Sequence, residues 1–148
     1  MRIYLDTCCY NRRYDDKSIG DIFTEYQDII AIQKEIVSGN IELATSFMLH
    51  YENYSKKNIE QRDSIDLFIK TYRKIYIGID YIEILKEKVK NIKSTGIKDK
   101  DSYHLASAIV ANCDYFVTVD KRLLKFSNDK IKIMNIIDFM EVYKNGKA

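Results

Sequence analysis

The stretch Tyr115-Phe116-Val117-Thr118-Val119-Asp120 tells most about how this 148-residue chain folds. Its first five residues are aromatic or β-branched and the run ends on an acid, which is typical of a central strand in a sheet. The preceding segment, residues 100–112, is predicted to be a helix because apolar residues recur there at helical spacing, namely Leu105, Ala106, Ile109 and Val110. A helix that leads into a buried strand indicates an α/β sheet.

The same alternation extends along the rest of the chain. Short β-rich runs predict four more strands, over residues 2–6, 41–45, 74–80 and 131–134. Apolar spacing predicts the other helices, over residues 18–38, 47–56, 59–73, 81–93, 121–126 and 136–143. We expect Ser18 to cap the first of these helices. The pattern predicts a single domain over residues 1–148, with a three-layer α/β/α fold around a central, mostly parallel five-stranded sheet.

Composition is that of a globular protein and excludes several other classes. Apolar residues make up 46% and charged residues 31%, with 24 Lys and Arg against 22 Asp and Glu, a net charge of +2. The absence of Pro and the 5 Gly exclude collagen-like chains and flexible linkers. No apolar run suits a membrane span and Asp6 comes too early for a signal peptide, so we expect a cytoplasmic protein. The three cysteines fit neither a disulfide framework nor a zinc motif.

Four acidic residues are predicted to meet at one edge of the sheet. Asp6 and Asp120 each end a predicted strand, and Asp101 begins the helix that leads into the second of these strands. The carboxyl ends of parallel strands form the ligand-binding edge of open α/β sheets. Glu52, in the helix after the second strand, is expected to point to the same edge. Each acid alone fits a turn or cap role, but a cluster of them is costly unless a hard cation such as Mg²⁺ or Mn²⁺ binds.

Two blocks of the chain carry the most specific pattern, Asp101-Ser102-Tyr103-His104-Leu105-Ala106-Ser107-Ala108 and the run from Tyr115 to Asp120. Together with Ile3-Tyr4-Leu5-Asp6-Thr7, and with Thr45-Ser46 followed by Glu52, they make nearly the whole chain resemble PIN-domain nucleases of the VapC-like ribonuclease kind. The resemblance implies that Asp6, Glu52, Asp101 and Asp120 bind one or two Mg²⁺ or Mn²⁺ ions and cleave RNA. It also implies an antitoxin protein and a homodimer as partners, because many small members are toxins of toxin–antitoxin pairs.

Further residues are assigned to the mechanism that this resemblance implies. Thr118 is expected to donate its hydroxyl to a ligand carboxylate. Arg12, in the loop after the first strand, is expected to bind an RNA phosphate. Asp99 is expected to cap the helix that follows it, and His104 is interpreted as a packed, hydrogen-bonded histidine within reach of the acids. Whether either of these two joins the metal site stays open, and none of the 12 tyrosines is assigned to RNA.

Other phosphate chemistries do not fit the first strand and its loop. A phosphatase of the haloacid dehalogenase type needs a second Asp two residues after Asp6, where Cys8 stands. A thiol phosphatase needs Arg six residues after its Cys, but Tyr14 and Asp15 follow Cys8 and Cys9 at that distance. The alternative that stays open is a non-catalytic PIN-like module that binds RNA or protein without cutting.

Overall fold

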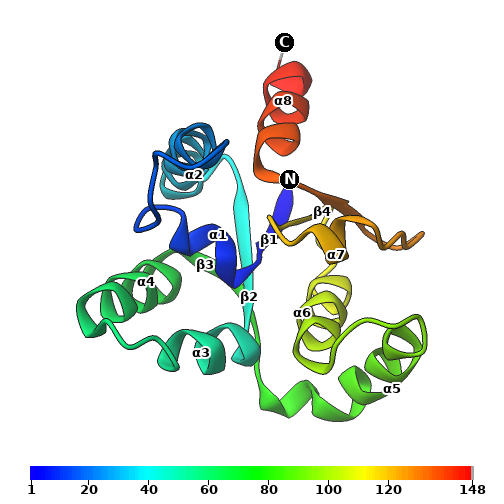
Figure 1. Ribbon diagram of the computed structural model, residues 1–148. Helices are drawn as coiled ribbons and strands as arrows, with labels where there is room; N and C mark the ends of the chain where they lie inside the picture. Colours follow the sequence, from blue (N-terminus) through cyan, green and yellow to red (C-terminus); the bar gives the residue numbers. More distant parts are fainter. Residues whose placement is uncertain (148) are drawn as a thin grey trace.

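The computed structural model of the protein describes residues 1–147 and contains one sheet of five strands (Figure 1). The strands are β1 (Arg2–Leu5), β2 (Glu42–Ser46), β3 (Arg73–Ile77), β4 (Tyr115–Val117) and β5 (Lys132–Met134). They lie in the order β3-β2-β1-β4-β5, and every neighbouring pair is parallel. The predicted α/β fold with a central five-stranded sheet is confirmed, and the sheet is parallel throughout.

Helices flank the sheet, with α2, α3 and α4 on one side and α5, α6 and α7 on the other (Figure 1). The helices before β3 are α1 (Thr7–Asn11), α2 (Ile22–Val37), α3 (Phe47–Tyr54) and α4 (Ile59–Tyr72). After β3 come the 3₁₀ helix η1 (Ile79–Tyr81), α5 (Ile82–Lys93), α6 (Asp99–Val110), α7 (Lys121–Leu124) and α8 (Ile136–Lys147). Right-handed crossovers between parallel strands produce this distribution, because the chain moves from β1 in one direction first and in the other direction later.

The chain changes direction between β1 and β4, which lie side by side at the centre of the sheet. From β1 it moves to β2 and β3 on one side, and then crosses to β4 and β5 on the other. Loops that leave the carboxyl ends of two such strands diverge and open a crevice between them, where ligands bind in α/β proteins. The Asp6 backbone N–H donates to the Val117 carbonyl at 2.9 Å, which holds the ends of β1 and β4 together at this point.

The central strands are buried on both faces because helices cover the sheet on each side. Ile3, Tyr4 and Leu5 of β1 have no exposed surface, and neither have Phe116 and Val117 of β4. Tyr4 stacks on Phe116 with ring centroids 5.3 Å apart. A tyrosine buried in this way needs a hydrogen-bond partner for its hydroxyl, and Tyr4 has two such partners. The Tyr4 hydroxyl therefore belongs to a set of polar groups buried in the core, with Ser46 and His104 as its partners.

The predicted start of the first long helix is wrong. Residues 18–21 form turns, and α2 begins at Ile22. Gly20 has a left-handed φ of 50°, a conformation that a right-handed helix excludes and that glycine adopts at low cost. Ser18 therefore does not cap the helix, and its backbone N–H and hydroxyl both donate to the Asp16 carboxylate.

Two further local features differ from the sequence predictions. Lys98 is the N-cap of α6, whereas Asp99 is its first helical residue and forms a surface ion pair with Lys93 at 3.0 Å. The short helix α1 was not predicted, because five residues are too few to show an apolar period. It begins where it does because the Asp6 side chain accepts a hydrogen bond from the first helical N–H.

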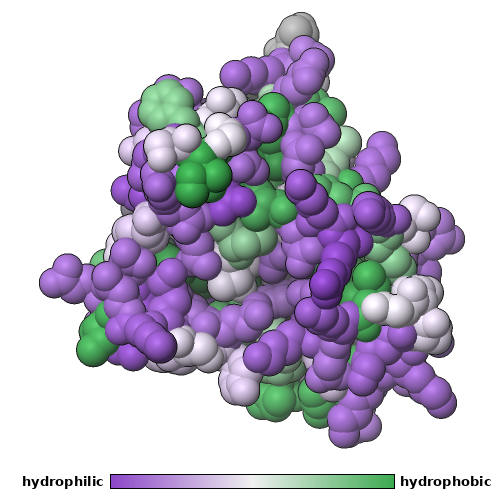
Figure 2. Space-filling view, in the orientation of Figure 1, coloured by the Kyte–Doolittle hydropathy of each residue, from purple (hydrophilic) through white to green (hydrophobic). Residues whose placement is uncertain are grey.

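The surface of the molecule is mostly polar. Hydrophilic residues cover most of the face seen in Figure 2, and hydrophobic residues show between them in separate groups. Scattered apolar groups of this kind are normal on a globular protein. Within residues 1–147, no helix is both long enough and apolar enough to cross a bilayer.

Candidate metal centre

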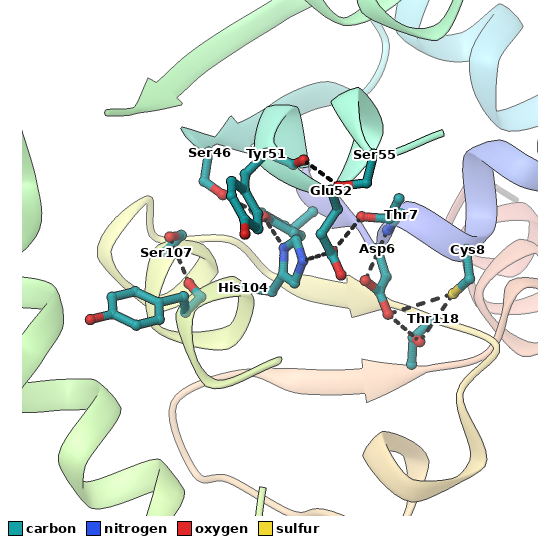
Figure 3. Close-up of polar contacts among 12 residues, drawn as sticks. Asp6, Thr7, Cys8, Ser46, Tyr51, Glu52, Ser55, His104, Ser107 and Thr118 are labelled. Atoms are coloured by element: carbon teal, nitrogen blue, oxygen red, sulfur yellow. Dashed lines mark hydrogen bonds and ion pairs between the residues drawn. The ribbon is translucent and has the colours of Figure 1, made fainter. Parts of the chain in front are cut away.

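Asp6 lies at the crevice between β1 and β4, and both of its carboxylate oxygens are held by hydrogen bonds (Figure 3). Oδ1 accepts from the Thr7 backbone N–H at 2.8 Å. Oδ2 accepts from the Thr118 hydroxyl at 2.8 Å and lies 3.5 Å from the Cys8 thiol. The side chain is buried, with 6% of the residue exposed. These bonds fix the direction of the carboxylate and leave Oδ1 with a further lone pair.

Glu52 lies on α3, and Thr7 links it to Asp6 by hydrogen bonds to both carboxylates. Its Oε1 accepts from the Thr7 hydroxyl at 2.8 Å and contacts His104 Nε2. Burial by itself raises the pKa of the Glu52 carboxyl, but the hydrogen bond and charge of His104, the Thr7 hydroxyl and the Lys100 ammonium outweigh it and lower the pKa. Glu52 is therefore an ionised acceptor at neutral pH, fixed through one oxygen.

His104 is fully buried and belongs to a chain of hydrogen bonds that ends on Glu52 (Figure 3). Its Nδ1 lies 2.6 Å from the Tyr4 hydroxyl, which lies 2.7 Å from the Ser46 hydroxyl. Burial raises the pKa of Tyr4 well above its usual value, so Tyr4 keeps its proton. Because the Glu52 carboxylate only accepts, its bond with His104 requires a proton on Nε2. The chain thus orients Glu52 from inside the core.

Asp101 stands one helical turn before His104 on α6 and is half-buried. Within residues 1–147 its carboxylate has no hydrogen-bond partner. Burial raises the pKa of Asp101. Three neighbouring carboxylates raise it further, those of Asp6, Asp120 and Glu52, while His104 acts in the opposite direction. The four predicted acids therefore act on one another electrostatically, and Asp101 carries the cost of that crowding.

Asp120 follows β4 and is tied to Asp6 through Thr118. The Asp120 backbone N–H donates to the Thr118 hydroxyl oxygen at 3.0 Å, and that hydroxyl donates to Asp6. The Asp120 side chain accepts from the Arg122 backbone N–H at 2.8 Å and so caps α7. The hydrogen bond from Thr118 to an acid is the one expected from the sequence. The cap role of Asp120 uses one oxygen and leaves the other for a ligand.

The donor set suits a hard divalent cation. Asp6, Glu52 and His104 each offer one ligand atom, and these atoms lie within 4.8 Å of one another. Both ring nitrogens of His104 already have hydrogen-bond partners, Tyr4 and Glu52, so neither nitrogen is available to a metal ion. Asp6 and Glu52 thus offer the oxygen ligands that Mg²⁺ and Mn²⁺ prefer, whereas Asp101 and Asp120 lie outside this group within residues 1–147. A cation there would also relieve the repulsion that raises the pKa of Asp101.

Arg12 has its charge balanced inside the protein. Its Nη1 pairs with Asp15 at 2.5 Å and its Nε with Glu25 at 3.3 Å, and 19% of the side chain is exposed. The guanidinium thus ties the segment after α1 to α2. The structure does not bring Arg12 together with the acids by any hydrogen bond or ion pair within residues 1–147.

Three residues of the site were not predicted as site residues. Thr7 bridges Asp6 and Glu52, and its place directly after the first acid is the only signal for this in the sequence. Tyr4 and Ser46 hold His104 and come from β1 and β2. A hydroxyl-bearing aromatic in the middle of an apolar strand is a hint that a polar partner lies inside. No local sequence pattern identifies that hydrogen-bond partner.

The fold is also found in solved structures of two complexes. The chain matches a structure of VapBC2 from Rickettsia felis bound to a DNA fragment from its promoter over 91% of this chain and 98% of the other, with a TM-score of 0.56 and 21% identity. It matches a structure of FitAcB from Neisseria gonorrhoeae over the same shares, with a TM-score of 0.53 and 13% identity. The protein has a PIN-like fold. No protein-family model and no curated protein sequence matches the chain.

The PIN-like fold accounts for where the acids lie. Its strand order places the ends of β1 and β4 side by side, with Asp6 directly after β1 and Asp120 after β4. Glu52 lies in the second half of α3, and Asp101 lies in the first turn of α6. At these levels of identity the likeness concerns the fold alone. The chemistry therefore has to be argued from the residues described above.

Proposed function

We propose that this protein is a metal-dependent endoribonuclease in which Asp6, Glu52, Asp101 and Asp120 hold Mg²⁺ or Mn²⁺. The observation that carries the proposal is the state of Asp101. This carboxylate is half-buried without a hydrogen-bond partner within residues 1–147, and three other carboxylates raise its pKa. Such an arrangement is unfavourable in a protein unless a cation completes it.

The chain's own residues orient the carboxylates. Thr7 and Thr118 donate to Asp6, and the His104 imidazole, backed by Tyr4, donates to Glu52. Hydrogen bonds of this kind fix the ligand directions and tune the affinity for the ion. When bound, a divalent ion supplies hydroxide near neutral pH and offsets charge on the cleaved phosphodiester. The open side of the site, at Asp101, is where an RNA phosphate would approach.

The biological setting that we propose is a toxin–antitoxin pair. Both structural neighbours are complexes, and VapBC2 was solved with a DNA fragment from its promoter. A chain with the same fold would have an antitoxin protein as a partner, and we keep a homodimer as part of the proposal. A phosphate contact by Arg12 would use Nη2, because Nη1 and Nε pair with Asp15 and Glu25.

The test is an RNA cleavage assay with the purified protein, single-stranded RNA and Mn²⁺, with EDTA as the metal-free arm. We expect cleavage to need Mn²⁺ and to fall at least about 100-fold in Asp6→Asn and Asp101→Asn. The matched control is Asp63→Asn, since Asp63 lies on α4 with a 63% exposed side chain paired to Arg62. Circular dichroism checks that each variant is folded. Equal cleavage by the wild type and both site variants would end the proposal.

The same assay separates the alternative of a non-catalytic module. Such a protein would retain RNA or a partner protein in EDTA and in Mn²⁺ alike, and would leave the RNA intact. Its binding would also survive Asp101→Asn, since neutralising a carboxylate removes repulsion towards phosphate.

A further inference from the structure

An exposed tyrosine and a lysine flank the acids where α3 meets α6. Tyr51 directly precedes Glu52, as Figure 3 shows, and Lys100 directly precedes Asp101. The Lys100 ammonium lies 5.3 Å from the centroid of the Tyr51 ring, a cation–π contact that joins the two helices. Lys100 also acts on the site itself, because its charge helps to lower the pKa of Glu52.

The Tyr51 ring is open to solvent. The residue is 58% exposed, so the aromatic face has room for a partner other than Lys100. Aromatic rings stack on the bases of single-stranded nucleic acids and contribute about 1–3 kcal/mol for each base. A lysine ammonium acts as a point charge for a phosphate. The two side chains together offer what one nucleotide presents, a base and a phosphate.

We propose that Tyr51 stacks on a base of the bound RNA and that Lys100 contacts the adjacent phosphate, so that the pair positions the strand over the acids. This inference rests on the proposed function, because it names residues that hold the substrate of the same site. It assigns a role to one of the 12 tyrosines. The role is substrate binding, and it does not include holding the metal.

Tyr54 provides a matched control on the same helix. It lies one turn after Tyr51, is 52% exposed, and has the Arg62 guanidinium 5.7 Å from its ring centroid. Arg62 belongs to α4, so the cation–π contact of Tyr54 is with α4 and not with α6. The two tyrosines therefore match in exposure and in cation–π contact, and differ in whether the cation adjoins a site acid.

The experiment measures cleavage of single-stranded RNA in Mn²⁺ by the wild type, Tyr51→Ala, Tyr51→Phe, Tyr54→Ala and Lys100→Gln. We expect Tyr51→Ala to lower kcat/KM by about 10- to 100-fold, mainly through KM, because the lost stacking energy is binding energy. Tyr54→Ala should cleave like the wild type, and Tyr51→Phe, which keeps the ring, should recover most of the activity that Tyr51→Ala loses. Lys100→Gln should raise KM and reduce its dependence on salt. The Mn²⁺ affinity of Tyr51→Ala should be unchanged, which a merely structural role for Tyr51 would not predict.

A binding measurement in EDTA separates this inference from the proposed function. An RNA that contains 2-aminopurine reports stacking through quenched fluorescence, and we expect quenching by the wild type and Tyr51→Phe but not by Tyr51→Ala. If the wild type cleaves and Tyr51→Ala cleaves equally well, the inference is wrong and the nuclease stands. If the wild type quenches through Tyr51 but does not cleave, the nuclease is wrong and the stacking role stands. If the wild type neither binds nor cleaves, both are wrong.

Discussion

The two histidines of the chain sit in similar local arrangements within opposite electrostatic surroundings. His104 contacts Glu52 and is fully buried, and His50 Nδ1 lies 3.0 Å from Asp66 and is half-buried. Each imidazole has a second partner on its other nitrogen. For His104 this is the Tyr4 hydroxyl, and for His50 it is the Arg73 guanidinium at 3.2 Å. Both are histidine–carboxylate pairs joined to a third group.

The charge around the two pairs differs. Asp66 pairs with the cation Lys70 at 2.9 Å, and the pKa of Asp66 is lowered because its hydrogen bonds and neighbouring charges outweigh its burial. The pKa of His50 is lowered by burial first, and Arg73 and Lys70 add to that effect. The charge of the His50–Asp66 pair is balanced by its immediate neighbours. The contacts of the pair join α3 to α4 and β3. The pKa of Glu52 is lowered as well, but Asp101 on α6 has its pKa raised by burial and by three carboxylates. Unbalanced charge therefore distinguishes the candidate site, and a histidine–carboxylate pair alone does not.

The largest difference should appear when each imidazole is removed. We expect His104→Ala to lower the free energy of unfolding by about 3 kcal/mol, because it leaves a cavity and removes one of the two hydrogen bonds of the buried Tyr4 hydroxyl. His50→Ala should cost about 1 kcal/mol or less, because its partners reach water. Urea denaturation followed by circular dichroism measures both values. Similar losses of unfolding free energy in the two variants would show that the hydrogen-bond chain through Tyr4 contributes no more stability than the contacts of His50.

The second difference concerns Mn²⁺. We expect the ion to stabilise the wild type by about 2.7 kcal/mol at roughly 100 times its Kd, seen as a rise in Tm. Asp66→Asn should show the same rise because its carboxylate is already balanced by protein cations. Asp101→Asn should show a smaller one. If the rise in Tm is lost in Asp66→Asn and kept in Asp101→Asn, the ion binds near His50 and Asp66 and not at the proposed site.

The smallest difference concerns the stability of the metal-free protein, which Asp101→Asn and Asp66→Asn should change in opposite directions. The pKa of Asp101 is raised in the folded state, so its ionised form costs stability at neutral pH, and Asp101→Asn should gain up to about 1 kcal/mol. That gain should shrink as the pH falls towards the unfolded value of about 3.9. The pKa of Asp66 is lowered, so Asp66 adds stability above about pH 3.9 that disappears as the pH falls through the folded pKa. Asp66→Asn should therefore lose stability at pH 7. Urea midpoints at pH 7 and pH 4 test both signs, and a loss in Asp101→Asn at pH 7 would contradict the crowding of acids.

Most of the fold follows from residue periodicity. The apolar run in β1 and the spacing of Ile29, Ile32 and Ile36 in α2 report burial, and all of these residues are buried. Helix starts are less predictable because they depend on single backbone conformations. Gly20 places the start of α2 at Ile22, and nothing in the apolar pattern says that this glycine takes a positive φ.

Residue chemistry and strand topology predict where the acids of the candidate site should lie. Acids after β1 and β4 have to meet at the crevice because parallel strands align their ends. The orienting contacts were not predictable, because Tyr4 and His104 lie 100 positions apart and meet only through the packing of α6 on the sheet. Arg12 shows the opposite case, since its nearness to Asp6 in sequence gives no contact between them and the arginine pairs with Asp15 instead.

The four acids come from positions 6, 52, 101 and 120, spread over most of the polypeptide. Translation delivers the N-terminal part first, so β1, β2 and β3 exist on the ribosome before the partner strand that completes the crevice. A nascent chain that ends before Asp120 carries no full set of carboxylates, however well its first half has folded. Whatever chemistry these acids perform therefore begins only after Asp120 has been added to the chain.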